Sequence, residues 1–210
     1  YIDAAQAVRH RIFDLAELQC DFLGFSAHKM MGPTGVGCLF VHKKWLNAMQ
    51  PYRYGGGMID IVTEEKTTFA ALLEAGTPNY SGVITWGAAL DYLMDIGIER
   101  MASYEEELLK KAEEVLAAIP QVNILGHPKQ RAGCISIQID GVHPYDFASM
   151  IDKYGVAVRT GSMCAQPIVN KMRLDTVIRI SPAFYNTMEE MEKLGEYTEK
   201  VIAFFERIKR

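Results

Sequence analysis

A lysine that stands between an apolar run and a glycine-proline turn is the first residue in this sequence that points to chemistry. Lys29 follows the mostly apolar run 20–25 and is followed by Gly32-Pro33. We interpret the run as a strand, and ligands of α/β sheets bind at the carboxyl ends of strands. A lysine amine that is partly desolvated at such a place can act as a nucleophile toward a carbonyl carbon. The alternative is a solvated loop lysine, which this pattern taken alone indicates more often.

A carboxylate on a second predicted strand end strengthens the first interpretation. Asp3 follows the apolar pair Tyr1-Ile2, and Gln6 comes shortly after it. Pyridoxal phosphate (PLP) is an aldehyde cofactor that bonds to lysine and whose pyridine nitrogen takes a carboxylate partner. We therefore predict that Lys29 anchors PLP, that Asp3 pairs with its ring nitrogen and that Gln6 donates to its phenolic oxygen. Neighbouring strands of one parallel sheet would bring these residues together.

A cysteine in a polar loop is the second nucleophile that the sequence predicts. Cys164 lies between Gly161 and Pro167, after a predicted strand. A lone cysteine is most often a buried structural residue. The loop favours a reachable thiol instead, and reachable, partly deprotonated thiols are the nucleophilic ones.

Two arginines flank this loop in the sequence. Arg159 ends the strand before the loop, and Arg179 lies in the apolar strand predicted at 177–181. A planar guanidinium binds a carboxylate through two parallel hydrogen bonds. A charge inside an apolar strand is costly unless it is used, which favours a binding role for Arg179. The alternative for each arginine is a surface ion pair.

Four motifs resemble, in order, those of the cysteine desulfurases and selenocysteine lyases of the class V aminotransferase superfamily, and the Suf-type group in particular. The resemblance extends from Tyr1 to about Arg210 and implies the α/β fold of fold-type I PLP-dependent transferases. Residues 1–96 would be the C-terminal part of the large parallel-sheet domain that binds PLP. Residues 97–210 would be a small C-terminal α/β domain that carries the cysteine loop. The motifs are Asp3-Ala4-Ala5-Gln6, Ser26-Ala27-His28-Lys29 with Gly32-Pro33-Thr34-Gly35, Glu74-Ala75-Gly76-Thr77-Pro78-Asn79, and Arg159-Thr160-Gly161-Ser162-Met163-Cys164-Ala165-Gln166-Pro167.

The resemblance implies an activity, the desulfuration of L-cysteine. Lys29 and Cys164 would be the catalytic residues. The lysine would hold PLP and move protons, and the cysteine would take the sulfur of the substrate as a persulfide, leaving L-alanine. A sulfur-acceptor protein of iron–sulfur cluster assembly would then receive the sulfur. The sequence departs from the family at Ser162 and Met163, where Suf-type enzymes often have histidine.

The resemblance also implies binding roles. Ser26 and His28 would contact the phosphate of the cofactor, and a hydroxyl and an imidazolium suit that anion. Thr77 would reach the phosphate bound in the other subunit of a homodimer. Arg179 would bind the α-carboxylate of the substrate, with Arg159 supporting the same pocket.

Two further hypotheses stay open. The first keeps the cofactor and makes the protein a selenocysteine lyase or another class V enzyme, such as a transaminase or an epimerase. Cys164 discriminates here, because transamination does not need it. The second hypothesis is a non-catalytic fragment for dimerisation or acceptor docking. The chain opens at Tyr1, inside a predicted strand, so we infer that it is a piece of a longer enzyme and expect the piece to be inactive alone.

Composition narrows the classes of partner. The 210 residues carry a net charge of -4, with 49% hydrophobic and 23% charged residues, an ordinary globular composition. We therefore expect no nucleic-acid or anionic-membrane partner, and no apolar run is long enough to span a bilayer. Four cysteines without a C-x-x-C pair predict no disulfide framework and no metal site. They favour a reducing compartment such as the cytoplasm.

The elements that must position these residues are predicted from periodicity and turn signals. The second half begins with a long amphipathic helix at 99–119, which Pro120 ends, and continues as a mixed sheet wrapped by helices. Thr187 and Glu190 form the capping box of the final helix. Besides the strands that lead to Asp3 and Lys29, the predicted strands are 37–41, 122–125, 134–139, 156–159 and 177–181, and the other predicted helices are 14–18, 43–49, 82–94, 145–154 and 188–208.

Overall fold

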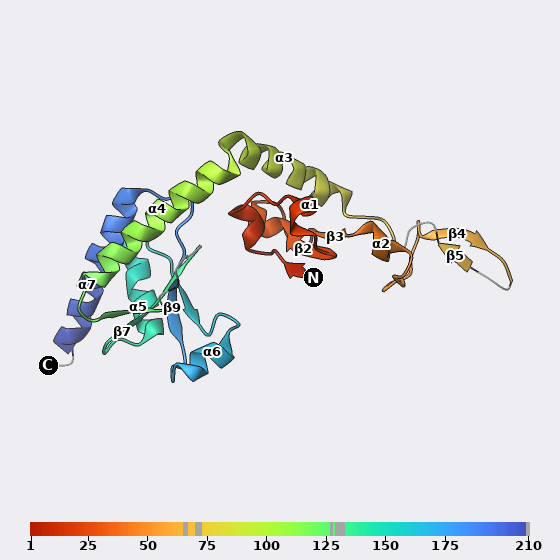
Figure 1. The fold of residues 1–210 in the computed structure, drawn as a ribbon. Helices are drawn as coiled ribbons and strands as arrows, with labels where there is room; N and C mark the ends of the chain where they lie inside the picture. The colour runs from red at the N-terminus through yellow and green to blue at the C-terminus, as the bar shows by residue number, and fades with distance from the viewer. Residues whose placement is uncertain (65–66, 70–72, 127, 129–132, 209–210) are drawn as a thin grey trace. The chain divides into compact units, whose positions relative to one another are not determined.

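The computed structural model of the chain describes residues 1–64, 67–69, 73–126, 128 and 133–208 (Figure 1). The chain divides into two compact units, Tyr1–Glu99 and Arg100–Arg210. The division falls at the beginning of a long helix, α4 (Ile98–Ala117), so nearly all of this helix belongs to the second unit. Within the described ranges, no helix combines the length and the apolar character that crossing a bilayer requires.

A three-stranded sheet with the order β1-β2-β3 forms the centre of the first unit. β1 (Ile2–Asp3) runs parallel to β2 (Phe22–Ser26), which confirms the predicted pair of parallel neighbours. β3 (Gly37–Val41) runs antiparallel to β2. The short connection 27–36 explains this direction, because a parallel third strand would need a longer crossover.

The connection between β2 and β3 begins with a tight 3₁₀ helix, η2 (Ala27–Met30), where the sequence predicted a loop. Two backbone hydrogen bonds close this turn. The Ala27 N–H donates to the Val36 carbonyl at 3.0 Å, and the Gly32 N–H donates to the Ala27 carbonyl at 2.9 Å. Lys29 therefore stands on a hydrogen-bonded turn rather than on an open loop.

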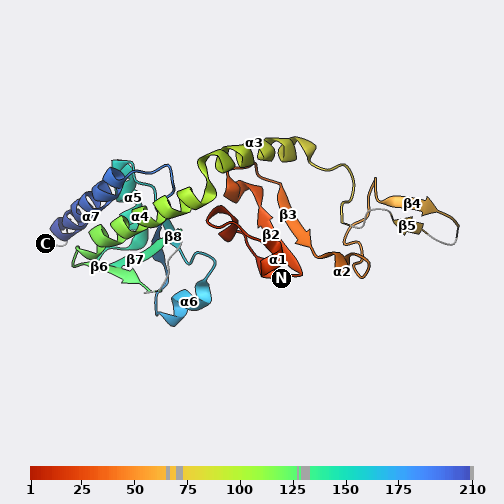
Figure 2. The same ribbon diagram turned by 45° about the horizontal axis from the view of Figure 1, so that its top comes forward.

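Helix α3 (Tyr80–Ile96) lies along one side of this sheet in both Figure 1 and Figure 2. It begins before the predicted residue 82 because Asn79 caps it: the Asn79 Oδ1 accepts a hydrogen bond from the Gly82 N–H at 3.1 Å. The sequence did not predict the antiparallel pair β4 and β5. The other elements of the unit are η1 (Ala7–Arg9), α1 (Leu15–Leu18), α2 (Lys43–Leu46), β4 (Ile59–Val62) and β5 (Thr67–Phe69).

The second unit is built on a four-stranded sheet with the order β6-β7-β9-β8. Every adjacent pair is antiparallel, so the predicted mixed sheet is wrong. β7 and β8 do run in the same direction, with a helix in the connection between them, but β9 lies between the two strands and opposes both. The strands are β6 (Val122–Leu125), β7 (Ile135–Ile139), β8 (Arg159–Gly161) and β9 (Val177–Ile180).

The segment before β8 differs from its prediction. The predicted strand 156–159 begins only at Arg159, because the backbone just before it still belongs to a helix end: the Val156 N–H donates to the Ile151 carbonyl at 3.4 Å. The helical segment itself is confirmed, as α5 (Pro144–Ile151) followed by η3 (Asp152–Tyr154).

Helices α4, α5 and α7 (Met188–Ile208) cover one face of this sheet and form the core with it (Figure 2). Because side chains alternate along a strand, Ser136 and Arg179 lie on the opposite face. A short helix, α6 (Gln166–Lys171), follows the cysteine loop. Fully or almost fully buried core side chains include Leu108, Leu116, Ile135, Ile137, Phe147, Ile151, Ile178 and Val201.

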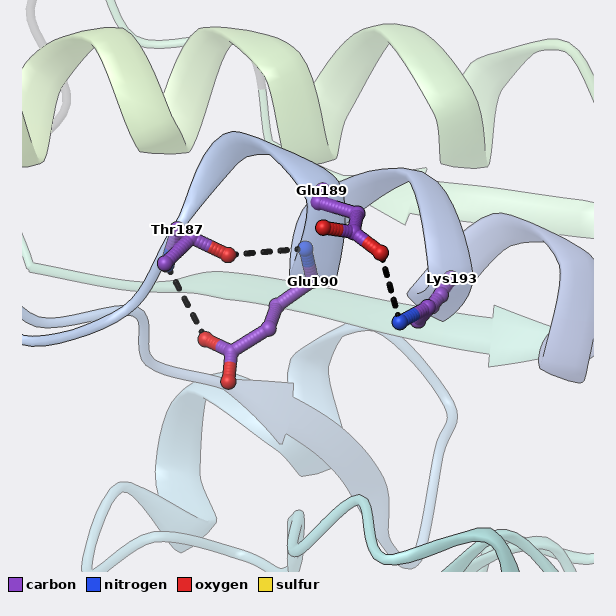
Figure 3. Close-up of polar contacts among 4 residues, drawn as sticks. All are labelled: Thr187, Glu189, Glu190 and Lys193. Carbon is purple, nitrogen blue, oxygen red and sulfur yellow. Dashed lines mark hydrogen bonds and ion pairs between the residues drawn. The ribbon is translucent and has the colours of Figure 1, made fainter.

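The last helix begins with the predicted capping box, which Figure 3 shows. The Glu190 N–H donates to the Thr187 Oγ1 at 3.2 Å, and the Thr187 N–H donates to the Glu190 Oε2 at 3.0 Å. One turn further on, Lys193 forms an ion pair with Glu189 at 2.7 Å. Each side chain of the box satisfies a backbone donor that the first helical turn leaves open, which fixes where α7 begins.

Candidate active site

Two of the predicted cofactor residues stand at the ends of neighbouring parallel strands. Asp3 is the last residue of β1 and lies opposite Gly24 of β2, which ends at Ser26. The Asp3 Oδ1 accepts a hydrogen bond from the Ala5 N–H at 3.0 Å, which holds the exposed carboxylate at the strand end. The parallel pairing thus brings an acid and a hydroxyl to one edge of the sheet.

A hollow of about 560 Å³ lies at this edge of the first unit. It is open to solvent and contains both Asp3 and Ser26 in its wall. Gln6, His28, Lys29 and Thr77 are not among the residues that line it. The lining residues are Tyr1, Asp3, Ala5, Gly24, Phe25, Ser26, Gly37, Cys38, Leu39 and Glu74.

Lys29 stands on the turn that follows Ser26 directly. The residues on either side of the pair His28 and Lys29 anchor the turn, because Ala27 is completely buried and Met30 is 6% exposed. Lys29 itself is partly buried and His28 is exposed. The buried anchors fix the backbone on either side of the pair, and the Lys29 side chain is only partly buried.

The other two predicted cofactor residues are exposed. Gln6 lies at the beginning of η1, and Thr77 follows Gly76, whose φ is 80°, in the loop before α3. Sequence reasoning gave no role to Cys38 and Glu74, although both line the hollow. Glu74 is the first residue of the motif that contains Thr77, and this position in the motif was the signal from which its place at the site could have been predicted. Partial burial raises the pKa of the Cys38 thiol above its ordinary value.

The chemistry of this donor set fits PLP. A carboxylate suits the protonated pyridine nitrogen, and an amine suits the aldehyde. A hydroxyl and an imidazole suit the phosphate. Ser26, His28 and Lys29 are consecutive with Ala27, and Asp3 shares the hollow with Ser26. The first unit therefore presents a set of groups of the kinds that PLP requires.

The cysteine loop of the second unit has an unusual backbone. Met163 and Cys164 both adopt left-handed conformations, with φ of 54° and 61°. Such a conformation costs a non-glycine residue about 1–3 kcal/mol, and strained residues of this kind cluster at functional sites as well as at helix ends. The turn is closed by the Ala165 N–H, which donates to the Ser162 carbonyl at 2.8 Å. The Cys164 side chain is exposed, so it is not the buried structural thiol of the alternative interpretation.

The two arginines lie side by side in the second unit. Arg159 of β8 is directly opposite Arg179 of β9, and Ser136 of β7 flanks Arg179 on its other side. The Arg179 Nε is buried and has no hydrogen-bond partner among the residues that the structure describes. Neither guanidinium forms an ion pair with a carboxylate of the described ranges. Two guanidinium groups that share a sheet face without an acid are groups of the kind that bind an anion.

Comparison with known proteins identifies the relatives of the chain. The sequence profile of the family "Aminotransferase class-V" matches residues 1–194. A cysteine desulfurase of Salmonella choleraesuis (strain SC-B67) is 43% identical over 197 residues, which are 92% of this chain and 48% of that protein. One from Salmonella typhimurium (strain LT2) matches to the same extent. The chain thus spans about half the length of the curated relatives it matches.

Solved structures agree with these matches. The cysteine desulfurase CsdA from Escherichia coli, in an S-sulfonic acid form, superposes with a TM-score of 0.89 at 34% identity, covering 96% of this chain and 51% of that chain. The apo cysteine desulfurase from Thermococcus onnurineus NA1 gives a TM-score of 0.90 at 33% identity, covering 96% and 52%. The predicted α/β fold, that of fold-type I PLP-dependent enzymes, is confirmed.

Proposed function

Since the chain belongs to the class-V aminotransferase family, we propose that it is part of a PLP-dependent cysteine desulfurase that converts L-cysteine to L-alanine and an enzyme persulfide. One observation of the structure carries the proposal: Asp3 and Ser26 share one hollow at the ends of parallel strands, directly before the turn that bears Lys29. The similarity to the cysteine desulfurases supports the choice of reaction.

The first unit holds the cofactor in this proposal. Lys29 bonds to its aldehyde carbon, Asp3 keeps the pyridine nitrogen protonated, and Gln6 donates to the phenolic oxygen. Ser26 and His28 hold the phosphate. When bound, PLP supplies an electron sink for the negative charge that develops on the α-carbon of the substrate. A carboxylate already held by a backbone N–H, as Asp3 is, stays in place for this role.

Lys29 also moves protons. As a free amine during turnover it takes the α-proton of the substrate, and its place on a closed turn with buried anchors limits the positions that the amine can reach. Thr77 contacts the phosphate of the partner subunit in a homodimer. The exposure of Thr77 within the first unit is compatible with this role.

Cys164 collects the sulfur. Its thiolate attacks the substrate sulfur, so an S–S bond forms while the C–S bond breaks and its electron pair stays with the substrate carbon. Protonation of that carbon gives alanine. L-cysteine and the Cys164 thiol thus become L-alanine and the Cys164 persulfide, and no external oxidant or reductant is needed. The exposed thiol in its left-handed turn can then pass the sulfur to an acceptor protein of iron–sulfur cluster assembly.

The arginine pair binds the substrate anion. Arg179 binds the α-carboxylate through its guanidinium, which forms no ion pair within the described part of the chain, and Arg159 supports the same pocket. We further propose that residues 1–96 belong to the large cofactor domain and residues 97–210 to a small domain that carries the cysteine loop. A reducing compartment, the cytoplasm, suits four cysteines that are all free thiols.

The test begins with PLP and the whole enzyme that contains this chain. Reduction with borohydride and peptide mapping should place the phosphopyridoxyl group on Lys29. The variant Lys29→Ala should lose the label, whereas Lys43→Ala, which removes an exposed lysine of α2, should keep it. Labelling spread over surface lysines, or equal in both variants, would overturn the cofactor assignment and favour a non-catalytic docking fragment.

The second step tests the thiol. Cys164→Ser in the whole enzyme should keep PLP on Lys29 but form neither alanine nor persulfide from L-cysteine, whereas Cys20→Ser should form both. Alanine formation at the normal rate by Cys164→Ser would remove the persulfide step. L-selenocysteine as a second substrate decides between a desulfurase and a selenocysteine lyase, because only a lyase of the second kind should prefer it strongly.

A further inference from the structure

The turn that carries Lys29 rests on a buried tryptophan of helix α3. Trp86 is 8% exposed, and its ring lies against the turn so closely that a Cβ added to Gly32 would be 2.6 Å from the Trp86 Cδ1. The same ring packs edge-on against Phe25, the residue before Ser26, with a centroid distance of 5.8 Å and an interplanar angle of 70°. Trp86 thus contacts both the strand that leads to the lysine and the turn that bears it.

Helix α3 supports this turn at a second point. A Cβ on Gly82, one helical turn before Trp86, would lie 2.5 Å from the Val36 Cγ2. Val36 is the residue whose carbonyl accepts the Ala27 N–H and so closes the turn. Small residues at Gly32 and Gly82 therefore permit a close approach of turn and helix, and a larger residue at either position would separate them.

The indole of Trp86 is held by its shape rather than by its polar atom. The Trp86 Nε1 is buried and has no hydrogen-bond partner within the described part of the chain. A buried donor without an acceptor costs stability, and a phenylalanine would avoid this cost while keeping an aromatic ring in the same place. The contribution of Trp86 to the turn is therefore the space that its ring fills.

We infer that Trp86 is a positioning residue for Lys29. Its ring fixes the turn 27–32 against β2. Because the turn is fixed, the Lys29 amine is held where the cofactor aldehyde is to be bound. The catalytic use of a fixed Lys29 amine rests on the proposed function. The contact between the Trp86 ring and the turn does not depend on it. Two measurements separate the two claims.

The first measurement does not involve a cofactor. In the purified chain, amide hydrogen exchange reports the opening of the turn through the Ala27 and Gly32 N–H groups, which are bonded within it. Trp86→Ala should speed exchange of these two amides by about tenfold or more, because the turn loses its support. Trp86→Phe should exchange close to the wild-type rate.

The other tryptophan of the chain provides the matched control. Trp45 is 38% exposed on α2 and stacks on Phe22, at the opposite end of β2 from the turn. Trp45→Ala should leave exchange of the two turn amides unchanged. Equal exchange of these amides in wild-type and folded Trp86→Ala chains would overturn the inference.

The second measurement uses PLP as the probe. After incubation and borohydride reduction, the yield of label on Lys29 should fall by about tenfold or more in Trp86→Ala, since a displaced reactive group loses rate steeply. The label should return to near the wild-type yield in Trp86→Phe. This measurement uses the whole enzyme that contains the chain: if it is not labelled on Lys29, the proposed function fails, and hydrogen exchange alone decides the role of Trp86.

A second variant covers the case in which Trp86→Ala does not fold. The methyl group of Gly32→Ala would lie 2.6 Å from the Trp86 Cδ1 and also 2.9 Å from the Ala27 Cβ, so this variant should speed exchange at Ala27 through both contacts. In the double variant Gly32→Ala with Trp86→Phe, exchange at Ala27 should rise by less than the two single effects combined, because the smaller ring relieves the contact with residue 86 while the contact with Ala27 remains. Strict additivity, or wild-type exchange in Gly32→Ala, would contradict a contact that positions the turn.

Discussion

Replacing Arg179 with methionine should stabilise the second unit while it removes the proposed anion site. Arg179 lies directly opposite Arg159 in the register of β8 and β9, so two like charges share one face of the sheet. The Arg179 Nε is buried without a hydrogen-bond partner in the described ranges. Methionine keeps most of the length of the arginine stem but carries neither the charge nor the buried donor.

The expected gain follows from these two features. Like charges directly opposite in a sheet are destabilising by about 0.2–1 kcal/mol, and the exposure of Arg159 places this pair toward the lower value. A buried donor that lacks an acceptor costs about 1–3 kcal/mol. We therefore expect Arg179→Met to raise the free energy of unfolding by about 1–2 kcal/mol, which is near the sum of the lower limits of these two ranges.

Urea unfolding at several salt concentrations measures both contributions. The matched control Arg159→Met removes the like charge but leaves the buried Arg179 Nε. Its free energy of unfolding should therefore rise by at most about 0.5 kcal/mol, and salt should reduce this rise. The larger part of the gain in Arg179→Met should persist in salt. A loss of stability in Arg179→Met would refute the reasoning, since it would mean that the guanidinium is already satisfied in the folded chain.

Three further predictions concern single side chains. Glu105, 3% exposed, accepts a hydrogen bond from the Phe184 N–H at 3.0 Å, so Glu105→Ala should lower the free energy of unfolding by about 1–3 kcal/mol in thermal or urea unfolding, and Glu105→Gln by less. The pKa of Glu190 is lowered, first by a hydrogen bond from the Asn186 side chain. A lowered folded pKa gives stability that is present above the unfolded pKa and lost as pH falls through the folded one. Between the folded and unfolded pKa values of Glu190, the stability of Glu190→Gln should therefore depend less on pH than that of the wild type, which acid unfolding measures. Finally, alkylation followed by mass mapping should label Cys38 more slowly than Cys164, because burial raises the pKa of the Cys38 thiol. The labelling rate of Cys38 should rise at alkaline pH.

Periodicity and caps were sufficient for the long helices. The final helix runs from Met188 to Ile208 as predicted, because Thr187 and Glu190 define its start through side-chain hydrogen bonds that the local sequence already contains. α4 differs from its prediction only by a residue or two at each end, where helix ends are weakly defined. These elements depend on contacts between neighbours in sequence, which a pattern can report.

Strand partners were less predictable. The mixed sheet was wrong because β9 is inserted between β7 and β8, and no local pattern states which strand will occupy the position between two others. β8 began later than predicted because the Val156 N–H was already used by the end of α5. Both errors concern hydrogen bonds to residues outside the strand itself, and such bonds exist only once the unit has folded.

The sequence by itself determined the residue types that can do chemistry and their order: an amine before a glycine-proline turn, a carboxylate at a strand end, and a cysteine between glycine and proline. Motif spacing carries this information because a strand end and its following turn are local. Only the tertiary structure decided that Asp3 and Ser26 line one hollow, that Arg159 and Arg179 face each other, and that Trp86 lies beneath the lysine turn. These relations join residues from different strands and helices, and packing between elements sets them rather than the propensity of any one segment.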